Sequence, residues 1–424
     1  MKKVAFYTLG CKVNQYETNG MIQKLMNRYE IVEPDKKADI YIVNTCSVTN
    51  MSDRKSRQML RRAKEINSEA LVIAVGCYAE TAKEEIEKIP EVDLVLGNHQ
   101  KANIAEYIEA YLEGKILNDE AIESYFYDFG TVTYTEKTRA VIKVQDGCNN
   151  FCSYCIIPYA RGRICSRKPE SVLREIKEIA ENGIKEVVIT GIQVSSYGKD
   201  FENNYKLIDL LEDINKIDGI ERIRLGSLEP LIITDEFCDR LSGINKMCHH
   251  FHLSLQSGCD KTLKEMNRRY TTEQFEKVVE RLRNLYNDVI LTTDIIVGFP
   301  NETDNDFEST YEYLKKIKFY KTHVFKYSPR KGTVASKMKN QIPGDVKEER
   351  SKRLIELSTE NQNEYLKDYI DKKVDVLFEE REDDFLKGHT ANYIMVKSIQ
   401  DDDKLNKIVT VNIKSFENEF LKDV

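Results

Sequence analysis

The sequence has little of what interrupts regular structure, with 8 prolines and 19 glycines among 424 residues. This scarcity, together with 41% hydrophobic residues, excludes a fibrous or disordered chain and indicates a folded globular protein. Long apolar runs are missing too, because a stretch such as 71–77 is far shorter than the ~20 residues of a membrane-spanning helix. The first residues include lysines but no apolar core of signal-peptide length. We therefore expect a cytoplasmic protein that makes no use of a membrane.

An excess of positive charge is also absent. The net charge is −7, so the overall composition does not attract nucleic acid, and any RNA contact has to come from a local basic patch. One such run lies between residues 54 and 64 and contains no acidic residue. A solvated helix face explains a run of this kind equally well. Its cations are Arg54, Lys55, Arg57, Arg61, Arg62 and Lys64.

The length predicts two to three domains. In the first, residues 1–118, short runs rich in Val, Ile and aromatic residues alternate with amphipathic stretches, which is typical of βαβ units and an open parallel sheet. Residues 115–137 are expected to be a connector or an edge segment. The predicted strands are 3–9, 39–44, 71–75 and 92–96, and the predicted helices are 17–29, 52–66 and 81–88.

A second alternation, over residues 135–365, predicts six β/α units and hence a full or partial β/α barrel of the TIM type, with its functional groups at the carboxyl ends of the strands. The charged stretch 345–371 predicts a long helix, and residues 370–424 predict a small all-β barrel from short runs at 374–378, 393–396 and 408–411. The predicted barrel strands are 139–144, 186–190, 222–225, 252–255, 291–297 and 323–327, with helices at 169–182, 207–217, 234–241, 272–285 and 304–317.

Three of the ten cysteines, Cys148, Cys152 and Cys155, lie on one short segment directly after the first predicted barrel strand. In a reducing compartment such spacing indicates metal binding rather than a disulfide. Soft sulfur ligands favour either an iron–sulfur cluster or zinc. A structural zinc site needs four protein ligands, and Cys165 would have to complete it because no histidine lies nearby. Three cysteines on a four-iron cluster instead leave one iron open for chemistry.

The pattern Cys-x3-Cys-x2-Cys, followed by IIPYARGR, resembles the radical S-adenosylmethionine (radical SAM) superfamily and specifically its methylthiotransferase branch. The resemblance covers nearly the whole chain. It implies that the open iron of a 4Fe–4S cluster binds S-adenosylmethionine, and that a reductant such as flavodoxin or ferredoxin supplies the electron that cleaves it.

Polar residues and glycines follow the other predicted barrel strands, where a ring of ligand-facing groups would lie. Taken singly, each is explained as well by a helix cap or a turn. In the resembled family such loops hold the cofactor, and the resemblance therefore implies a cofactor-binding set of Tyr154, Gln193, Ser227, Glu229, Gln256, Asp294 and Gly298.

A second trio, Cys11, Cys46 and Cys77, is far apart in sequence, but each member immediately follows a predicted strand of the first domain. Because parallel strands present their carboxyl ends along one edge, these cysteines can meet in one crevice. The alternative is three small buried residues. The surrounding Gly10-Cys11-Lys12 and Asn44-Thr45-Cys46 segments resemble the N-terminal domain of methylthiotransferases, and this resemblance implies an auxiliary 4Fe–4S cluster. The other cysteines, Cys165, Cys238, Cys248 and Cys259, are expected to be structural.

The family acts on three kinds of acceptor: isopentenyladenosine in tRNA, N6-threonylcarbamoyladenosine in tRNA, and an aspartate of a ribosomal protein. The segments around Cys11 and Cys46 most resemble the threonylcarbamoyladenosine branch. A tRNA anticodon stem-loop is therefore the expected partner, with the run that starts at Arg54 close enough to Cys46 to steer it. Residues 374–393 resemble the TRAM domain, in which Tyr393 is expected to stack on a base or ribose. A rival of another class is a nonenzymatic iron–sulfur RNA-binding redox sensor, which would not consume S-adenosylmethionine.

Overall fold

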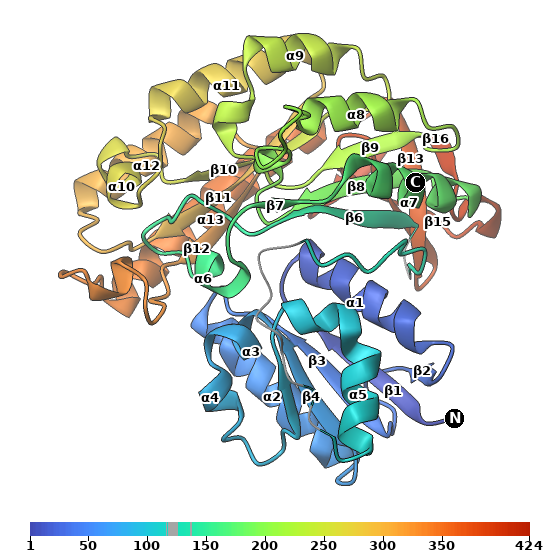
Figure 1. Ribbon diagram of the computed structural model, residues 1–424. Coiled ribbons are helices and arrows are strands. Elements are labelled where there is room, and N and C mark those ends of the chain that lie inside the picture. The colour runs from blue at the N-terminus through green and yellow to red at the C-terminus, as the bar shows by residue number, and fades with distance from the viewer. Residues whose placement is uncertain (116, 118–125, 136–137) are drawn as a thin grey trace.

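The computed structural model describes residues 1–115, 117, 126–135 and 138–424. Figure 1 shows an N-terminal α/β unit below a larger arc of parallel strands and helices, with a C-terminal sheet behind the arc. This is the α/β class that the sequence predicts, and it includes the small all-β unit. The predicted domain ranges 1–118, 135–365 and 370–424 stay predictions, and residue 118 itself lies outside the described residues.

The N-terminal unit is a five-stranded parallel sheet in the order β2-β1-β3-β4-β5. The two central strands β3 and β4 are buried along their whole length because helices cover both faces of the sheet, and this explains their continuous apolar sequence. Its strands are β1 (Lys3–Thr8), β2 (Glu30–Val32), β3 (Ile40–Thr45), β4 (Leu71–Gly76) and β5 (Leu94–Leu96), and its helices are α1 (Lys12–Leu25), α2 (Asn50–Ile66), α3 (Cys77–Thr81), α4 (Lys83–Ile86) and α5 (Ile104–Leu112).

The four predicted strands of this unit are confirmed, but two helices begin earlier than predicted. Helix α1 starts at Lys12, directly after Cys11, and α3 starts at Cys77 itself. The edge strand β2 was not predicted because it is only three residues long and partly exposed. These early starts place Cys11 and Cys77 where a strand end meets the start of a helix.

The predicted connector, residues 115–137, falls partly outside the described residues, which omit 116, 118–125 and 136–137. Its described part is not a free linker. Phe129 and Val132 are buried in the core of the N-terminal unit, and Asp128 pairs with Arg167 of the barrel at 3.1 Å. This segment therefore packs against both units.

Six parallel strands form a partial barrel, as predicted, in two groups. One is β6-β8-β9 with the short antiparallel β7 at its edge, and the other is β10-β11-β12. Isolated parallel bridges, Ile223 to Met247 and Leu228 to Leu253, join the groups at β9 and β10. The elements are β6 (Arg139–Asp146), α6 (Ile157–Arg161), β7 (Cys165–Ser166), α7 (Pro169–Glu181), β8 (Glu186–Gly191), α8 (Leu207–Asn215), β9 (Arg222–Leu225), α9 (Asp235–Ser242), β10 (His250–Gln256), α10 (Asp260–Glu265), α11 (Thr272–Leu285), β11 (Ile290–Val297), α12 (Asp304–Ile317) and β12 (Lys321–Lys326).

The C-terminal unit follows a long helix and is a six-stranded sheet in the order β16-β13-β14-β15-β18-β17, antiparallel except between β15 and β18. Arg222, the first residue of β9, donates to the carbonyls of Asp375 and His389 at 2.9 and 3.0 Å, so the sheet covers the amino ends of barrel strands. Its elements are α13 (Gly344–Lys367), β13 (Lys373–Glu382), β14 (Phe385–Thr390), β15 (Met395–Ile399), β16 (Ile408–Asn412), β17 (Ser415–Glu417) and β18 (Phe420–Lys422).

The long helix and three of these strands were predicted, with one difference at Tyr393. This residue has a φ of 73° and precedes β15, which begins at Met395, so the predicted strand 393–396 starts too early. In the part of the chain that the structure describes, no helix combines the length and the apolar character needed to span a membrane.

Candidate functional site

The cysteines of the N-terminal unit lie at one edge of its sheet. Cys11, Cys46 and Cys77 follow β1, β3 and β4, which are neighbours in the sheet. Cys46 and Cys77 are 6% and 4% exposed, whereas Cys11 is exposed. Burial raises the pKa of the Cys46 thiol, and the proximity of Cys77 and Cys11 raises it further. The three thiols therefore interact electrostatically, as the positions of the strands predict.

Glycine precedes two of these cysteines for a steric reason. Gly10 has a φ of 99°, and a β-carbon added there would lie 2.8 Å from Sγ of Cys46. Gly76 has a φ of 100°, and its added β-carbon would lie 2.7 Å from the carbonyl oxygen of Thr45. Both positions combine a left-handed backbone with close packing, so a larger residue would push the cysteine loops apart.

Buried amides hold these loops together. Asn14 donates from Nδ2 to the carbonyls of Leu9 and Thr45 at 2.7 and 3.0 Å, which ties the loop after β1 to the end of β3. Asn44 donates to the carbonyl of Asn14 at 2.9 Å, and the backbone N–H of Tyr78 donates to Oγ1 of Thr45 at 3.2 Å. Side chains of α1 and β3, together with a backbone N–H after β4, thus hold the three cysteine loops in place.

The second trio lies on the loop between β6 and α6, at the carboxyl end of the first barrel strand. The thiol of Cys148 donates to Oε1 of Gln193 at 3.2 Å, and Sγ of Cys152 accepts from Nη1 of Arg268 at 3.3 Å. Burial raises the pKa of Cys155 to about 12, with further contributions from Cys152 and Cys148. The three thiols therefore share one site, which two other barrel loops border.

The rest of the barrel shapes this loop. Gly147 has a φ of 66°, and an added β-carbon would overlap the carbonyl of Arg163. Ser153 donates its N–H to the carbonyl of Met266 at 3.0 Å, and its own carbonyl accepts from the N–H of Ala335 at 2.8 Å. The loop is short in sequence, yet its conformation depends on segments more than a hundred residues away.

The donor sets fit iron–sulfur clusters better than a single ion. Within the described residues, no group of three or more His, Cys, Asp or Glu side chains is placed around one metal ion. A mononuclear zinc site would require such a group, whereas a four-iron cluster holds its thiolates farther apart. Cys165, the possible fourth zinc ligand, lies in β7 beside Asp146, and burial together with Asp200 and Asp146 raises its pKa to about 11. Each trio leaves one corner of a four-iron cluster without a cysteine.

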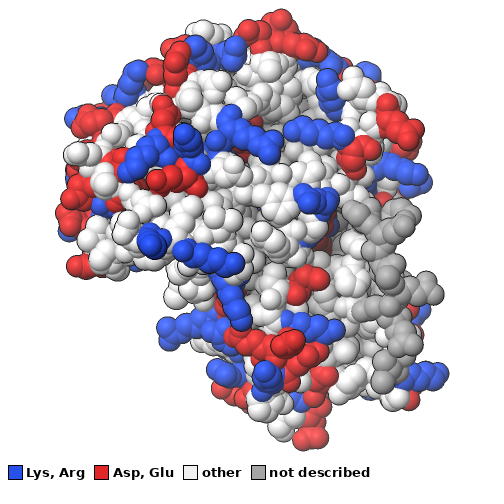
Figure 2. Space-filling view, turned by 60° about the vertical axis from the view of Figure 1, so that its left-hand side comes forward, with Lys and Arg blue, Asp and Glu red and all other residues white. Residues whose placement is uncertain are grey.

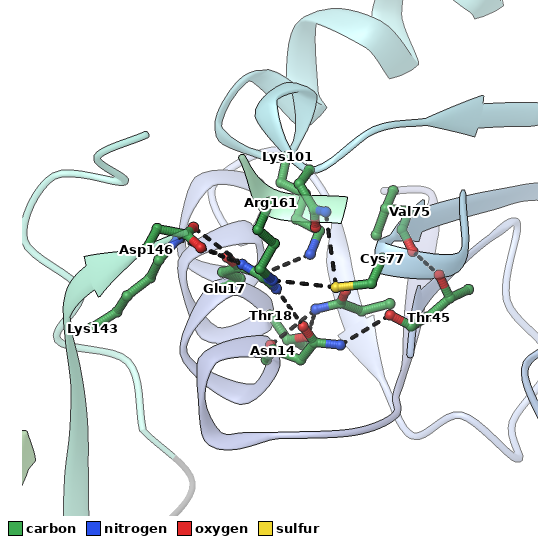
Figure 3. Close-up of polar contacts among 12 residues, drawn as sticks. Asn14, Glu17, Thr18, Thr45, Val75, Cys77, Lys101, Lys143, Asp146 and Arg161 are labelled. Carbon is green, nitrogen blue, oxygen red and sulfur yellow. Dashed lines mark hydrogen bonds and ion pairs between the residues drawn. The ribbon is translucent and has the colours of Figure 1, made fainter. Parts of the chain in front are cut away.

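A buried ion cluster joins Cys77 of the N-terminal unit to Asp146 at the end of β6, two residues before Cys148, and was not predicted from the sequence (Figure 3). Arg161, at the end of α6, donates from Nε to Sγ of Cys77 at 3.2 Å and from Nη2 to Oδ1 of Asn14 at 2.7 Å. The same guanidinium contacts carboxylates of Glu17 and Asp146 at 2.8 and 3.1 Å. These contacts pull the pKa of Glu17 well below its usual value, although burial opposes this shift.

Two lysines complete the cluster. Nζ of Lys101 lies 2.6 Å from Glu17, and Nζ of Lys143 lies 2.8 Å from Glu17 and 2.5 Å from Asp146. Three buried cations thus face two carboxylates and the sulfur of Cys77, which leaves one positive charge of the cluster without a carboxylate partner. In the sequence, Arg161 stands out because it lies within the motif IIPYARGR, but no sequence pattern indicates that it pairs with Glu17 and Asp146.

The residues predicted to bind the cofactor do not form one ring. Gln193 and Glu229 line a cavity of about 320 Å³ beside Asn150 and Arg268, and Glu229 pairs with Arg268 at 2.9 Å. Ser227 and Asp294 instead line a separate cavity of about 760 Å³. Arg268, which touches both Cys152 and Glu229, was not predicted, because a single arginine in an Arg-Arg pair carries no motif signal.

The other predicted cofactor residues, Tyr154, Gln256 and Gly298, line neither of these two cavities. Tyr154 packs edge-on against the ring of Phe299. Gln256 is 9% exposed and has a φ of 70° at a bulge in β10. Gly298 has a φ of 70° and donates its N–H to the carboxylate of Glu302 at 2.6 Å. These three residues shape the barrel wall in this structure, and their contact with a cofactor stays a prediction.

The basic run lies on α2 and divides into two groups. Arg57 donates a hydrogen bond to the hydroxyl of Tyr78 at 2.6 Å, and Lys64 forms an ion pair with Asp93 at 3.0 Å. The others are exposed and have no ion pair among the described residues: Arg54, Lys55, Arg61 and Arg62. Figure 2 shows basic and acidic side chains mixed over one face of the molecule, so any RNA contact there would rest on small groups of this kind.

Tyr393 lies at the wall of the larger cavity and not on an outer surface. Its ring stacks on His389 with centroids 4.7 Å apart, and the guanidinium groups of Arg224 and Arg139 lie 4.6 and 5.2 Å from its centre. Base stacking on Tyr393 stays a prediction, and a base would have to enter the cavity to reach it.

Comparison with known proteins agrees with this geometry. Residues 142–314 match the Radical SAM superfamily, and residues 3–97 match "Uncharacterized protein family UPF0004". In solved structures the fold is similar to the radical SAM methyltransferase TsrM from Kitasatospora setae, with a TM-score of 0.56 and 15% identity, covering 77% of this chain and 73% of that one. A partial β/α barrel with three cysteines after its first strand thus defines the class, a radical SAM enzyme.

Curated relatives narrow the class. Threonylcarbamoyladenosine tRNA methylthiotransferase MtaB of Bacillus subtilis is 39% identical over 97% of this chain and 94% of its own length, and that of Aquifex aeolicus is 42% identical over 93% and 96%. A tRNA-2-methylthio-N(6)-dimethylallyladenosine synthase of Clostridium botulinum is 36% identical over 96% and 93%. The chain belongs to the radical SAM methylthiotransferase family, whose enzymes use S-adenosylmethionine and 4Fe–4S clusters.

Proposed function

We propose that this enzyme adds a methylthio group to carbon 2 of N6-threonylcarbamoyladenosine beside the anticodon of tRNA. The observation that carries the proposal is the pair of cysteine trios, one on each side of the interface that Arg161 crosses. Relatives named for threonylcarbamoyladenosine are more similar to this chain than those named for dimethylallyladenosine, and this difference favours the former acceptor.

The two trios have separate roles in this proposal. Cys148, Cys152 and Cys155 hold the cluster that binds S-adenosylmethionine, and the auxiliary cluster is held by Cys11, Cys46 and Cys77. When bound, these cofactors supply the one-electron chemistry and the methylthio group.

The neighbouring side chains orient these ligands and exclude water. Arg268 donates to Cys152 and keeps Glu229 in place through its second nitrogen. Arg161 likewise donates a hydrogen bond to the sulfur of Cys77. The burial of Cys46 limits access of water to the auxiliary site. Hydrogen bonds to ligating sulfur raise the reduction potential of a cluster, so Arg268 and Arg161 also adjust when each cluster accepts an electron.

The partners follow from this chemistry. A tRNA anticodon stem-loop binds near the auxiliary site, where the exposed cations of α2, among them Arg54 and Lys55, attract its phosphates. A reductant such as flavodoxin or ferredoxin supplies electrons. Because tRNA is modified where it is made and used, we place the enzyme in the cytoplasm.

Mass spectrometry of tRNA nucleosides tests the proposal. Cells without the gene should lack the 2-methylthio derivative of N6-threonylcarbamoyladenosine, and the intact gene should restore it while Cys152→Ala does not. Loss of the isopentenyl derivative, or of methylthio-aspartate in a ribosomal protein, would assign another acceptor. If nothing is lost and the reduced protein does not consume S-adenosylmethionine, the redox-sensor alternative is correct.

A further inference from the structure

The cavity of about 760 Å³ lies where the three units meet. Gly10, Cys11 and Lys12 of the N-terminal unit line one end, and His389 and Tyr393 of the C-terminal sheet line the other. The barrel supplies the side walls, including residues at the carboxyl ends of its strands such as Gly191 and Ser227. The volume is within the range of ~300–1,000 Å³ that small-molecule sites occupy, and it suits one modified nucleoside.

Most charged groups that line the cavity already have partners. Arg224 pairs with Glu186 at 2.6 Å and Lys321 with Glu419 at 2.8 Å. Asp294 lies 3.2 Å from Nε2 of His252. Lys12 differs, because no carboxylate pairs with it among the residues that the structure describes.

Lys12 is the residue after Cys11 and the first residue of α1, so its backbone is fixed at the auxiliary site. Its side chain is exposed and lines the cavity. Burial would raise the pKa of Tyr393, but the charges of Arg139 and Lys12 lower it. Burial is the main cause of the lowered pKa of His250, and the charge of Lys12 adds to it. The cavity therefore has an uncompensated positive charge next to Cys11.

We propose that the cavity accepts the target nucleoside and that Lys12 binds the carboxylate of its threonyl side chain. The inference rests on the proposed function and deepens it, because it says how this acceptor is selected. The threonyl group carries a negative charge at neutral pH, whereas an isopentenyl group is neutral and apolar. Inside a partly desolvated cavity a cation stabilises the carboxylate, and a neutral isopentenyl group cannot make this contact.

A binding experiment isolates this contact from chemistry. Three anticodon stem-loops are compared on the full chain with both clusters reconstituted: one with N6-threonylcarbamoyladenosine, one with its carboxylate converted to an amide, and one with unmodified adenosine. The wild-type protein should bind the first about tenfold or more tightly than the second, because a charged hydrogen bond is lost in the amide. Lys12→Gln should remove this difference and leave affinity for the unmodified loop unchanged.

Two matched variants serve as controls. Lys24→Gln neutralises an exposed lysine near the other end of the same helix and should retain the full discrimination. Lys12→Arg keeps the charge and should retain most of it, and both Lys12 variants should carry the iron content of the wild type. If Lys12→Arg loses discrimination as completely as Lys12→Gln does, charge recognition is wrong.

The outcomes separate this inference from the proposed function. If Lys12→Gln weakens all three stem-loops equally, Lys12 contacts an RNA phosphate and the inference fails. It also fails if Lys12→Gln still prefers the carboxylate over the amide. If instead the wild-type enzyme forms product only on an isopentenyladenosine loop, the proposed function itself fails.

Discussion

The two cysteine trios reach the same arrangement by opposite routes. Cys148, Cys152 and Cys155 are neighbours in sequence on one loop, and the surrounding barrel only adjusts their conformation. Cys11, Cys46 and Cys77 come together only because three parallel strands end at one edge of a sheet. The first site is therefore encoded locally and the second by topology. From this difference we expect that substitutions in the N-terminal sheet or its loops change the site of Cys11, Cys46 and Cys77 and leave the site of Cys148, Cys152 and Cys155 unchanged.

Replacing one ligand of each trio should give the largest effects and separate the two sites. Cys152→Ala should lower release of 5′-deoxyadenosine from S-adenosylmethionine by three orders of magnitude or more, on the order of the loss when a catalytic group is removed. Cys46→Ala should retain some of this release but form no methylthio product. Liquid chromatography of both products measures this, and full product from Cys46→Ala would refute the role of the auxiliary trio.

A substitution beside a ligand should empty the auxiliary site alone. Gly10→Ala places a β-carbon 2.8 Å from Sγ of Cys46 at a φ of 99°, so it should remove about half of the iron, which is one of two clusters. Gly183→Ala is the control, since it has a φ of 84° but open space around its added carbon. Iron analysis after reconstitution compares them, and equal losses in both variants would show that the contact with Cys46 is not the cause.

The contacts that Arg161 makes between the N-terminal unit and the barrel should be visible in the stability of the protein. Arg161→Met removes the buried donor of Cys77 and of Oδ1 of Asn14, and one of the three cations around Glu17, so it should reduce the free energy of unfolding by about 3 kcal/mol. The nearby Arg163 is exposed and stacks on Phe151, so Arg163→Met should cost less than about 1 kcal/mol. Anaerobic urea unfolding measures both, and equal costs would contradict a special role for the ion cluster.

The smallest effect is expected at the amide that joins the cysteine loops. Asn14→Ala removes two hydrogen bonds to backbone carbonyls and the one that Arg161 donates to Oδ1, and it should destabilise the protein by about 2 kcal/mol. Gln15→Ala, which loses one partly buried bond to Asn19, should cost about 1 kcal/mol or less. If urea unfolding shows no greater cost for Asn14→Ala, the loops do not depend on this network.

Sequence patterns predicted the architecture well where burial produces periodicity. All six barrel strands, and four of the five strands of the first sheet, lie where apolar runs place them. Short edge strands such as β2 and β17 were not predicted, because they bury few side chains. Helices α1 and α3 begin earlier than predicted, because a Gly-Cys pair at the start of a helix is not a recognised helix-start signal. Strand order, once inferred, was enough to predict that Cys11, Cys46 and Cys77 meet.

The surroundings of the site could not be predicted in the same way. Arg161 contacts Glu17 and Asn14 of one unit and Asp146 of another, and such pairing depends on how the units dock. Four residues of the predicted cofactor set line two cavities, Gln193 and Glu229 the smaller one and Ser227 and Asp294 the larger one, and their contact with a cofactor stays a prediction. The sequence thus predicted where the cysteines lie along the strands, their role as ligands stays a prediction, and the docking of the units determines their neighbours.

Counting clusters in three forms of the protein tests the central claim most directly. After anaerobic reconstitution, the wild-type chain should hold about eight iron atoms, and either triple variant, with Cys148, Cys152 and Cys155 or with Cys11, Cys46 and Cys77 changed to Ala, should hold about four with its own paramagnetic resonance spectrum. A folded triple variant that keeps about eight iron atoms, or a wild-type chain that never exceeds about four, would contradict the account.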